Sequence, residues 1–231
     1  VLFITIAVFT FFAGFLGDRY NRKWIITVSL LFWSCATAAI GLIDNFEIWG
    51  LTISAFAMTM FLRSIAVGGG ESFYAPSAMS LLASCHKKTR SLAFSIHQAA
   101  LYFGLMMSGV LAAKVLGFFG SWRAVFVAFG LAGLVLGLVF IFALREVPRD
   151  VVDAKKDKLP LSASFKAYFT NPSALLATTG FIAIVCVNNA YLTWAPKIFA
   201  ERFGVDAGAA GSHTMFYHHL VAFVAILIGG W

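Results

Sequence analysis

Two charged side chains interrupt one long apolar segment of this chain, and both can do chemistry in such surroundings. Arg63 can hold an anionic substrate or a coupling carboxylate, and Glu71 can take and release a proton. Charges within an apolar span are costly and mark functional positions by default. On an ideal helix the two residues lie about 12 Å apart along the axis and about 80° apart in rotation. We therefore expect each to have a different partner; the alternative is a structural buried ion pair.

Amide and aromatic side chains occur together in a later apolar segment. Asn188 and Asn189 are adjacent, and Tyr191 and Trp194 follow at helical spacing. Asn188, Tyr191 and Trp194 lie near one helix face by i, i+3 steps. Amides in hydrocarbon need hydrogen-bond partners. These residues either join neighbouring helices or bind a substrate where two helical bundles meet.

A third group of polar side chains lies in a segment between these two. Gln98 and Tyr102 are four residues apart and share a helix face, with His97 beside them. The three residues either line a cavity or pack against a neighbouring helix, and the spacing does not decide between these alternatives.

The remaining histidines and the cysteines do not suggest a metal site. His213, His218 and His219 fall on different faces of a helix, and the chain contains no HExxH motif. Proton coupling at His218 or His219 is a weaker alternative. No CxxC or metal-ligand spacing occurs among the three cysteines, which we expect to be small buried or lipid-facing residues: Cys35, Cys85 and Cys186.

The composition places these residues in a membrane protein. Of the 231 residues, 61% are hydrophobic and 12% are charged, whereas soluble domains average about 45–50% and about 25%. The net charge of +7 comes from basic residues in short loops between apolar runs. It therefore indicates membrane topology rather than a nucleic-acid surface.

Seven segments are long and apolar enough to predict membrane-spanning helices, which need about 20 mostly apolar residues each. The third is too long for one straight crossing and contains three consecutive glycines and Pro76, so we expect a bent span. The fold class expected is an all-α polytopic membrane protein with these spans: 1–17, 24–42, 49–83, 91–116, 122–144, 173–196 and 209–231.

Basic residues alternate between the loops. Twelve Lys and Arg residues lie in the odd-numbered loops and four flank the even-numbered ones, which predicts that the odd loops are cytoplasmic. The polar, proline-punctuated stretch 146–172 is predicted to be a cytoplasmic linker between two bundles, 1–145 and 173–231. Within the linker, 162–169 can form a short amphipathic helix on the membrane surface.

The segments near the two ends of the chain have similar sequences of apolar residues and glycine. The segment 7–18 resembles 222–231, and both termini lie within apolar runs. We therefore expect a fragment of a longer protein built from repeated helical bundles, an architecture typical of transporters.

Four motifs resemble those of the major facilitator superfamily, whose signature loop is G-x-x-x-D-R-x-G-R-K. They are Gly14-Phe-Leu-Gly17-Asp18-Arg19-Tyr20-Asn21-Arg22-Lys23, Arg63-Ser-Ile-Ala-Val-Gly68-Gly-Gly-Glu71-Ser-Phe-Tyr74-Ala-Pro76, Gly120-Ser-Trp122-Arg123-Ala-Val-Phe126 and Trp194-Ala-Pro196. The resemblance covers the whole chain and is nearest to the Spinster-like and organic-anion symporter branches. It implies that the chain holds spans two to eight of twelve.

The resemblance also implies roles for residues. In the family the signature loop ties helix ends together on the cytoplasmic side in the outward-facing state, and the alternative is that its charges only set topology. Two departures occur. Asn21 replaces a glycine, and we expect the turn to survive because Asn tolerates left-handed backbone. The stretch 108–113 lacks the proline usual in antiporters. The implied gate residues are Gly14, Gly17, Asp18, Arg19, Arg22 and Lys23, and Tyr74 joins the substrate or coupling candidates.

These observations predict a monomeric secondary transporter of a bacterial inner membrane that moves a small organic anion by proton-coupled alternating access. A lysophospholipid or sphingolipid-type substrate is the alternative within this class. An intramembrane enzyme or a non-transporting sensor of the same fold are rival classes. We expect no enzymatic activity, no cofactor, no metal and no nucleic acid partner; the chain has no GxxxxGK[ST] motif for nucleotide binding.

Overall fold

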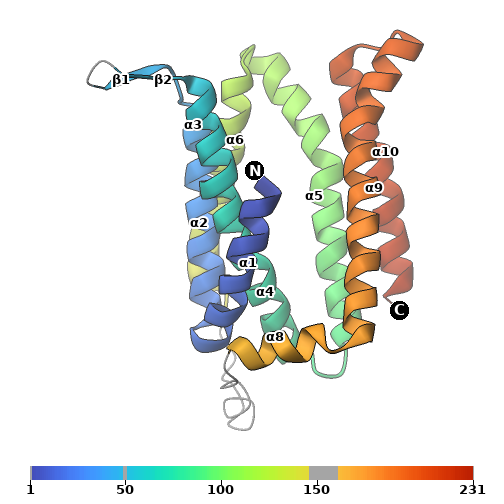
Figure 1. Ribbon diagram of the computed structural model, residues 1–231. Coiled ribbons are helices and arrows are strands. Elements are labelled where there is room, and N and C mark those ends of the chain that lie inside the picture. Colours follow the sequence, from blue (N-terminus) through green and yellow to red (C-terminus); the bar gives the residue numbers. More distant parts are fainter. Residues whose placement is uncertain (1, 49–50, 146–160, 231) are drawn as a thin grey trace. The chain divides into compact units, whose positions relative to one another are not determined.

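The apolar segments fold as helices, because hydrocarbon offers no water to satisfy backbone N–H and C=O groups. The computed structural model describes residues 2–48, 51–145 and 161–230. Figure 1 shows the elements in chain order: α1 (Leu2–Arg19), α2 (Arg22–Ile40), β1 (Phe46–Ile48), β2 (Leu51–Ile53), α3 (Ala55–Phe61), the π-helix η1 (Leu62–Val67), α4 (Gly68–Cys85), α5 (Arg90–Phe119), α6 (Trp122–Ala143), α8 (Leu161–Phe169), α9 (Pro172–Phe203) and α10 (Ala207–Gly229).

The chain divides into two compact units. Unit 1 comprises Val1–Phe94 and Lys114–Pro148, and unit 2 comprises Ser95–Ala113 and Arg149–Trp231. The middle of α5 therefore belongs to unit 2. Residues 146–160 of the predicted linker lie outside the described residues, so the predicted division into two bundles and a linker stays a prediction. A short helix, α8, forms where the sequence suggests one, and its position on a membrane surface also stays a prediction.

Glycines on one face of α6 bring this helix against α2 in unit 1 (Figure 1). A Cβ at Gly130 would lie 2.5 Å from the backbone N of Ala38, and one at Gly137 would lie 2.5 Å from Leu31 Cδ2. Gly133 approaches the side chain of Ser34 in the same way. Small residues at such spacing let two helix backbones approach closely, which is how spanning helices associate without a hydrophobic driving force.

Side chains from three helices form the core of unit 1. Ile26 of α2 packs with Ala78 and Leu81 of α4, and Phe140 of α6 packs against this cluster. Arg123 at the start of α6 donates to the carbonyl of Ile43 at 3.0 Å, so it holds the end of α2 as well. Helices α2, α4 and α6 therefore form one packed group.

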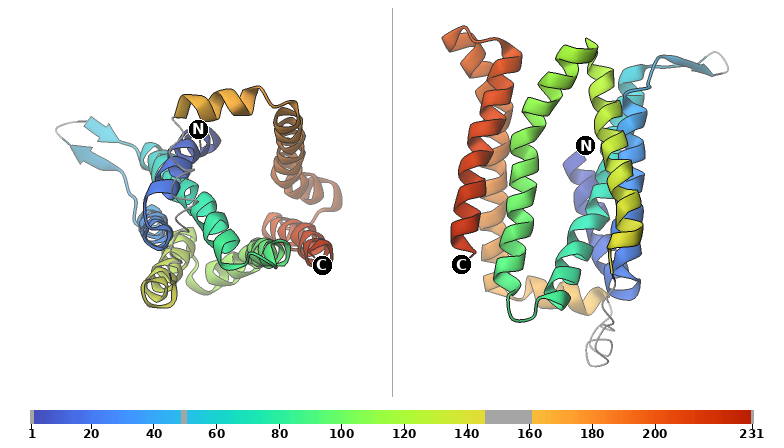
Figure 2. Two further views of the ribbon diagram at one scale, coloured as in Figure 1. Left: turned by 90° about the horizontal axis from the view of Figure 1, so that it is seen from below. Right: turned by 180° about the vertical axis from the view of Figure 1, so that it is seen from behind.

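In unit 2 the middle of α5 contacts α10 through the rings of Phe103 and Phe223, whose centroids lie 6.0 Å apart, and α9 lies beside α10 (Figure 2). A Cβ at Gly109 would lie 3.3 Å from the Cα of Ser212, and Gly230 sits against the side chain of Ser95. Between α9 and α10 the chain turns at Gly204, whose φ of 63° favours glycine. The side chain of Asp206 then caps α10 by accepting from the N–H groups of Gly208 and Ala209.

Five described helices are long and apolar enough to cross a membrane: α2, α5, α6, α9 and α10. They match five of the seven predicted spans to within a few residues, except that α9 runs to Phe203. The other two predicted spans correspond to α1 and to the continuous helical rod of residues 55–85, formed by α3, η1 and α4. Their crossing of a membrane stays a prediction.

The predicted start of the third span at residue 49 is wrong. Strands β1 and β2 pair antiparallel in a hairpin, with Phe46 opposite Ile53, and the helix begins only at Ala55. Asn45 accepts from the N–H of Ala55 at 3.0 Å, and Ser54 caps α3. The expected bend also differs in kind: a π-helix at Leu62–Val67 directly precedes the three glycines.

We expect Gly130→Ala to destabilise the full-length protein, because a methyl group would overlap the backbone at Ala38. Overpacking of this kind costs about 1–3 kcal/mol. Gly104→Ala is the matched control: it has open space around it, so it should be neutral or stabilising, as alanine is in a helix. The measurement is thermal unfolding in one detergent. Equal midpoints for the two variants would contradict the close approach of α2 and α6.

Candidate functional site

The short connection from α1 to α2 is tied to the far end of α4. Arg22 is only 8% exposed. Its guanidinium donates to Ser84 Oγ at 2.6 Å and to the carbonyl of Ser80 at 3.4 Å. Gly17 faces the same helix, because a Cβ there would lie 3.4 Å from Ser77 Oγ. The connection therefore joins the ends of three helices, α1, α2 and α4.

Asn21 does not use the left-handed backbone that its replacement of glycine suggests. Its φ and ψ are −65° and 117°, and its side chain accepts from the N–H of Trp24 at 3.3 Å. The turn survives because Asn is a good helix N-cap. Lys23 Nζ lies 5.6 Å from the centre of the Trp24 ring. Gly14 has open space around it, and the side chains of Asp18 and Arg19 lie outside the described residues.

Arg63 lies within the π-helix η1, and Glu71 lies in the first turn of α4. The two side chains are exposed on unit 1. In the described part of the chain neither forms an ion pair within 4.0 Å, so the buried ion pair expected as an alternative is not found there. The π-turn lies between Arg63 and Glu71 and changes their relative rotation, and the expectation that each has a different partner stays a prediction.

Tyr74 belongs to the packing of unit 1. Its ring meets Trp33 edge-on with centroids 5.6 Å apart, and it packs against the cluster formed by Ile26, Ala78 and Leu81. Edge-to-face contacts of this kind stabilise a helix interface. The geometry therefore favours a structural role for Tyr74, although it lies one turn after Glu71.

A polar cluster joins α9 and α10 in unit 2. His218 Nε2 lies 2.7 Å from Asn188 Oδ1, so the imidazole N–H donates to the amide oxygen. The ring of Tyr191 stacks on His218 with centroids 5.0 Å apart. His219, which is 2% exposed, bonds the carbonyl of Met215 at 2.8 Å through Nδ1 and has the ring of Tyr102 6.1 Å away. Three helices thus contribute to one cluster of hydrogen-bonding rings.

Two other predicted residues of unit 2, Asn189 and Trp194, make contacts outside this cluster. Asn189 donates to the carbonyl of Val185 in its own helix at 2.9 Å. Trp194 is exposed, with Lys197 Nζ 5.7 Å from its ring centre. His97 and Gln98 are half-buried on α5. Of the predicted set, the structure therefore brings Asn188, Tyr191 and Tyr102 to the two histidines.

A family model decides the identity of the chain. The model of the Major Facilitator Superfamily matches residues 1–231, which is the whole chain. The chain belongs to the major facilitator superfamily. The family fits an all-helical, polytopic membrane protein, and the family resemblance predicted from the four motifs is confirmed.

Curated relatives narrow the branch of this superfamily. Protein spinster homolog 1 of Xenopus laevis is 34% identical over 192 residues, which cover 79% of this chain and 34% of the relative. Protein spinster homolog 1 of Homo sapiens is 33% identical over 190 residues, with coverages of 79% and 34%. Sphingosine-1-phosphate transporter SPNS2 of Mus musculus is 26% identical over 188 residues, with coverages of 79% and 33%.

These likenesses agree with the Spinster-like branch. The chain spans about a third of the length of the curated relatives it matches. It is a piece of an integral, multi-pass membrane protein. The relatives are eukaryotic proteins, so they give no support to the expected bacterial inner membrane.

Sequence reasoning gave two features of this superfamily member too little weight. His218 and His219 are predicted only as a weaker alternative for proton coupling, but an adjacent His pair in an apolar helix is itself a signal for buried polar contacts. The π-turn at Arg63 was missed as well. The available signal is a charged residue inside an apolar segment, because such residues mark functional positions and π-turns are frequent at functional sites.

We expect Arg22→Ala to loosen the tie between α2 and α4. A hydrogen bond from a charged group contributes about 1.5–3 kcal/mol, and a double-mutant cycle with Ser84→Ala should recover a coupling energy of that order. Unfolding of the full-length protein in mixed micelles gives the free energies. Arg90→Ala removes an exposed guanidinium whose hydrogen bond to the carbonyl of Ala83 is long, at 3.5 Å, so this control should change little. A coupling energy near zero would contradict the tie.

Proposed function

We propose that the full-length protein is a secondary active transporter that moves an amphipathic organic anion, one with a lipid-type tail, by proton-coupled alternating access. The anionic headgroup of this substrate corresponds to the organic anion expected from the sequence. Its apolar tail corresponds to the lipid-type substrate expected as the alternative. The superfamily supports transport, and the Spinster relatives support this branch of it. Two bundles that rock about a central site would expose the substrate to each side in turn.

The observation that carries the proposal is the position of Arg63. It is a cation in a π-turn of an apolar helical rod, with no carboxylate within 4.0 Å in the described residues. A cation held in an apolar span is costly and is a functional hypothesis by default. An anionic headgroup bound to Arg63 would supply the missing opposite charge, and the guanidinium fork suits a carboxylate or phosphate.

The lipid-type tail is supported by the relatives. One of them is named Sphingosine-1-phosphate transporter, and that substrate joins a phosphate anion to an apolar chain. A soluble organic anion without a tail is the second candidate, and the same cation at Arg63 favours it.

Proton coupling is supported by the placement of Arg63 and Glu71 on one helical rod, with Arg63 in the π-helix η1 and Glu71 in the first turn of α4. A positive Arg63 favours the charged carboxylate. An anion bound to Arg63 would cancel that charge and so favour the protonated carboxyl. By thermodynamic reciprocity, a proton on Glu71 then favours anion binding at Arg63. Binding the two together is what a symporter requires.

The loop between α1 and α2 is proposed to be part of the cytoplasmic gate. The support is the buried hydrogen bond of Arg22 to α4 and the basic character of the odd loops, which predicts that they are cytoplasmic.

Two rival classes of function are an intramembrane enzyme and a sensor. An intramembrane enzyme would need a nucleophile and base or a metal cluster, whereas the names of the family and of SPNS2 point to transport. A sensor of the same fold would bind without flux.

The test of the proposal is uptake by the full-length protein in proteoliposomes, with and without a pH gradient. Sphingosine-1-phosphate is the lipid-type probe, and a short organic acid without a tail is the comparison. Uptake of the lipid that rises with an inward proton gradient is the expected result. Binding without flux would favour the sensor, and no gradient-dependent uptake of either probe would overturn the proposal.

We expect Arg63→Ala to abolish this uptake while the protein still expresses and folds, because the anion loses its counter-charge. Arg63→Lys should retain part of the rate, since it keeps the charge but not the guanidinium fork. Lys197→Ala is the control, because its exposed pair with Glu201 at 3.9 Å is of a kind that contributes little. Wild-type rates in Arg63→Ala would exclude Arg63 from the site.

For Glu71→Gln we expect uptake that no longer responds to pH, with exchange of labelled for unlabelled substrate retained. The amide keeps the shape of the protonated carboxyl but cannot release a proton. Initial rates of uptake across a series of external pH values, and counterflow at equal pH, measure the two effects. A pH response as steep as that of the wild type would show that another group carries the proton.

A further inference from the structure

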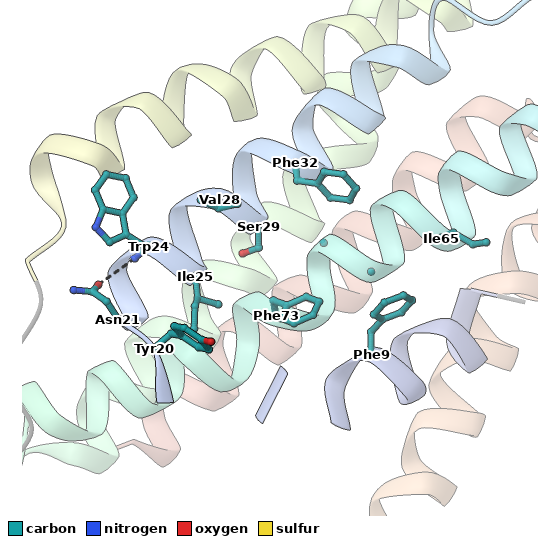
Figure 3. Close-up of a pocket in the computed structure, with 12 residues that line it drawn as sticks. Phe9, Tyr20, Asn21, Trp24, Ile25, Val28, Ser29, Phe32, Ile65 and Phe73 are labelled. Atoms are coloured by element: carbon teal, nitrogen blue, oxygen red, sulfur yellow. Dashed lines mark hydrogen bonds between the residues drawn. The ribbon is translucent and has the colours of Figure 1, made fainter. Parts of the chain in front are cut away.

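An apolar groove in unit 1 and a smaller cavity in unit 2 differ in the polar groups of their walls. The groove lies between α1, α2, η1 and α4 and has a volume of about 610 Å³. Figure 3 shows the side chain of Asn21 bonded to the N–H of Trp24, and the hydroxyl of Ser29 donates to the carbonyl of Ile26 at 3.0 Å. These side chains bond locally along α2, so the groove offers a ligand mainly apolar contact.

The cavity in unit 2 lies between α9 and α10. Its volume is about 340 Å³, which is within the range of small-molecule pockets. Phe199, Phe203 and Tyr217 contribute aromatic rings to its wall, and Tyr191 lines it as well. The ring of Tyr191 also stacks on His218, with the centroids 5.0 Å apart. The cavity therefore adjoins the polar cluster of α9 and α10 through Tyr191.

Three hydrogen-bonding groups of this cluster have no partner among the residues that the structure describes. Asn188 accepts at Oδ1 from His218 Nε2 at 2.7 Å, which leaves both N–H donors of its amide without a bond. The same bond leaves the lone pair of the neutral imidazole on Nδ1, where it is an acceptor. The third group is the hydroxyl of Tyr191, which can donate and accept.

These groups lie half-way along a helix that is long enough to span a membrane. Helix α9 has 32 residues, and Asn188 is about 24 Å from its first residue, Pro172. Polar groups without partners are costly at such a depth in hydrocarbon. The side chains of Asn188 and His218 are half-buried and that of Tyr191 is 42% exposed. Free groups in this position therefore point to a polar ligand that reaches them.

The chemistry of the cluster selects a neutral ligand group. In the described residues, neither the cluster nor the cavity wall contains a Lys, Arg, Asp or Glu side chain. An anion or a cation would have no counter-charge there. A hydroxyl donates one hydrogen bond and accepts up to two. It matches the acceptor on His218 together with the donors of Asn188 and Tyr191.

We propose that Asn188, Tyr191 and His218 bind a hydroxyl group of the transported amphipathic anion and so select substrates that carry one. This role rests on the proposed transport of such an anion. It differs from the role of Arg63, whose guanidinium recognises the negative charge. A site that hydrogen-bonds a hydroxyl rejects an analogue without it, because the polar groups of the site are then left unpaired.

The experiment is equilibrium binding of two probes to the full-length protein in mild detergent. One probe is hexadecyl glycerol phosphate, and the other is its deoxy analogue, which lacks only the free glycerol hydroxyl. The wild type should bind the first probe about tenfold more tightly, the order expected for the hydrogen bonds of one hydroxyl. Arg63→Ala should weaken both probes alike and keep this ratio, because the two carry the same charge.

Replacing both members of the hydrogen-bonded pair removes the site with the least disturbance of the fold. Asn188→Leu combined with His218→Phe exchanges two partners for apolar side chains of similar shape, which is nearly neutral for stability. This double variant should bind the two probes almost equally, and Tyr191→Phe should lower the ratio in part. Asn189→Leu is the matched control. That amide donates to the carbonyl of Val185 in its own helix, so the ratio should not change.

Equal binding of the two probes by the wild type, or a wild-type ratio in the double variant, would overturn the hydroxyl site. The free groups would then bond another part of the full-length protein. Uptake into proteoliposomes separates this result from the proposed function. A tenfold ratio in binding without uptake would overturn the proposed transport but not the hydroxyl site, whereas uptake of both probes with equal affinity would do the reverse. Binding of neither probe would overturn both.

Discussion

Hydrocarbon forbids an unpaired backbone, and the rest of this structure depends on that constraint. Each spanning segment must bond its own N–H and C=O groups, so the chain forms long helices with ends closed by side chains. Asn21, Asn171 and Asp206 each accept from the first N–H groups of a helix. The antiparallel hairpin of β1 and β2 lies between two of the helices rather than within one, where such a pairing is tolerated.

The same constraint sorts the polar side chains. Several hydroxyls and one amide bond a carbonyl one turn back in their own helix, as Thr37, Thr179 and Thr214 do. Those that instead reach another helix are few in the described residues, and Arg22 with Ser84 and Asn188 with His218 are examples. A bond of the first kind only satisfies a donor, whereas one of the second kind fixes how two helices meet.

The sequence predicted what depends on composition and spacing along one segment. Helix positions followed from apolar length, and the family followed from four local motifs. It could not predict what depends on rotation between segments: Asn188 meets His218 only because α9 and α10 present those faces to each other. A short apolar run at 46–53 fits strand and helix alike, so the hairpin was missed. Asn21 stands where the family motif has glycine and caps α2. This role could not be predicted from a motif that has glycine at the same position.

The π-turn at Arg63 shows how a helix in hydrocarbon can rearrange its faces without breaking its backbone bonding. The N–H of Gly68 bonds the carbonyl of Arg63, five residues back. Such a turn takes up one extra residue, and one residue is about 100° of helix rotation. The angle from Arg63 to Glu71 therefore falls from about 80° to about 20° in the opposite sense, which brings both onto one face. Because the surrounding medium excludes an unbonded loop, a π-turn is the means by which a rod of this kind can align a cation with a carboxylate eight residues away.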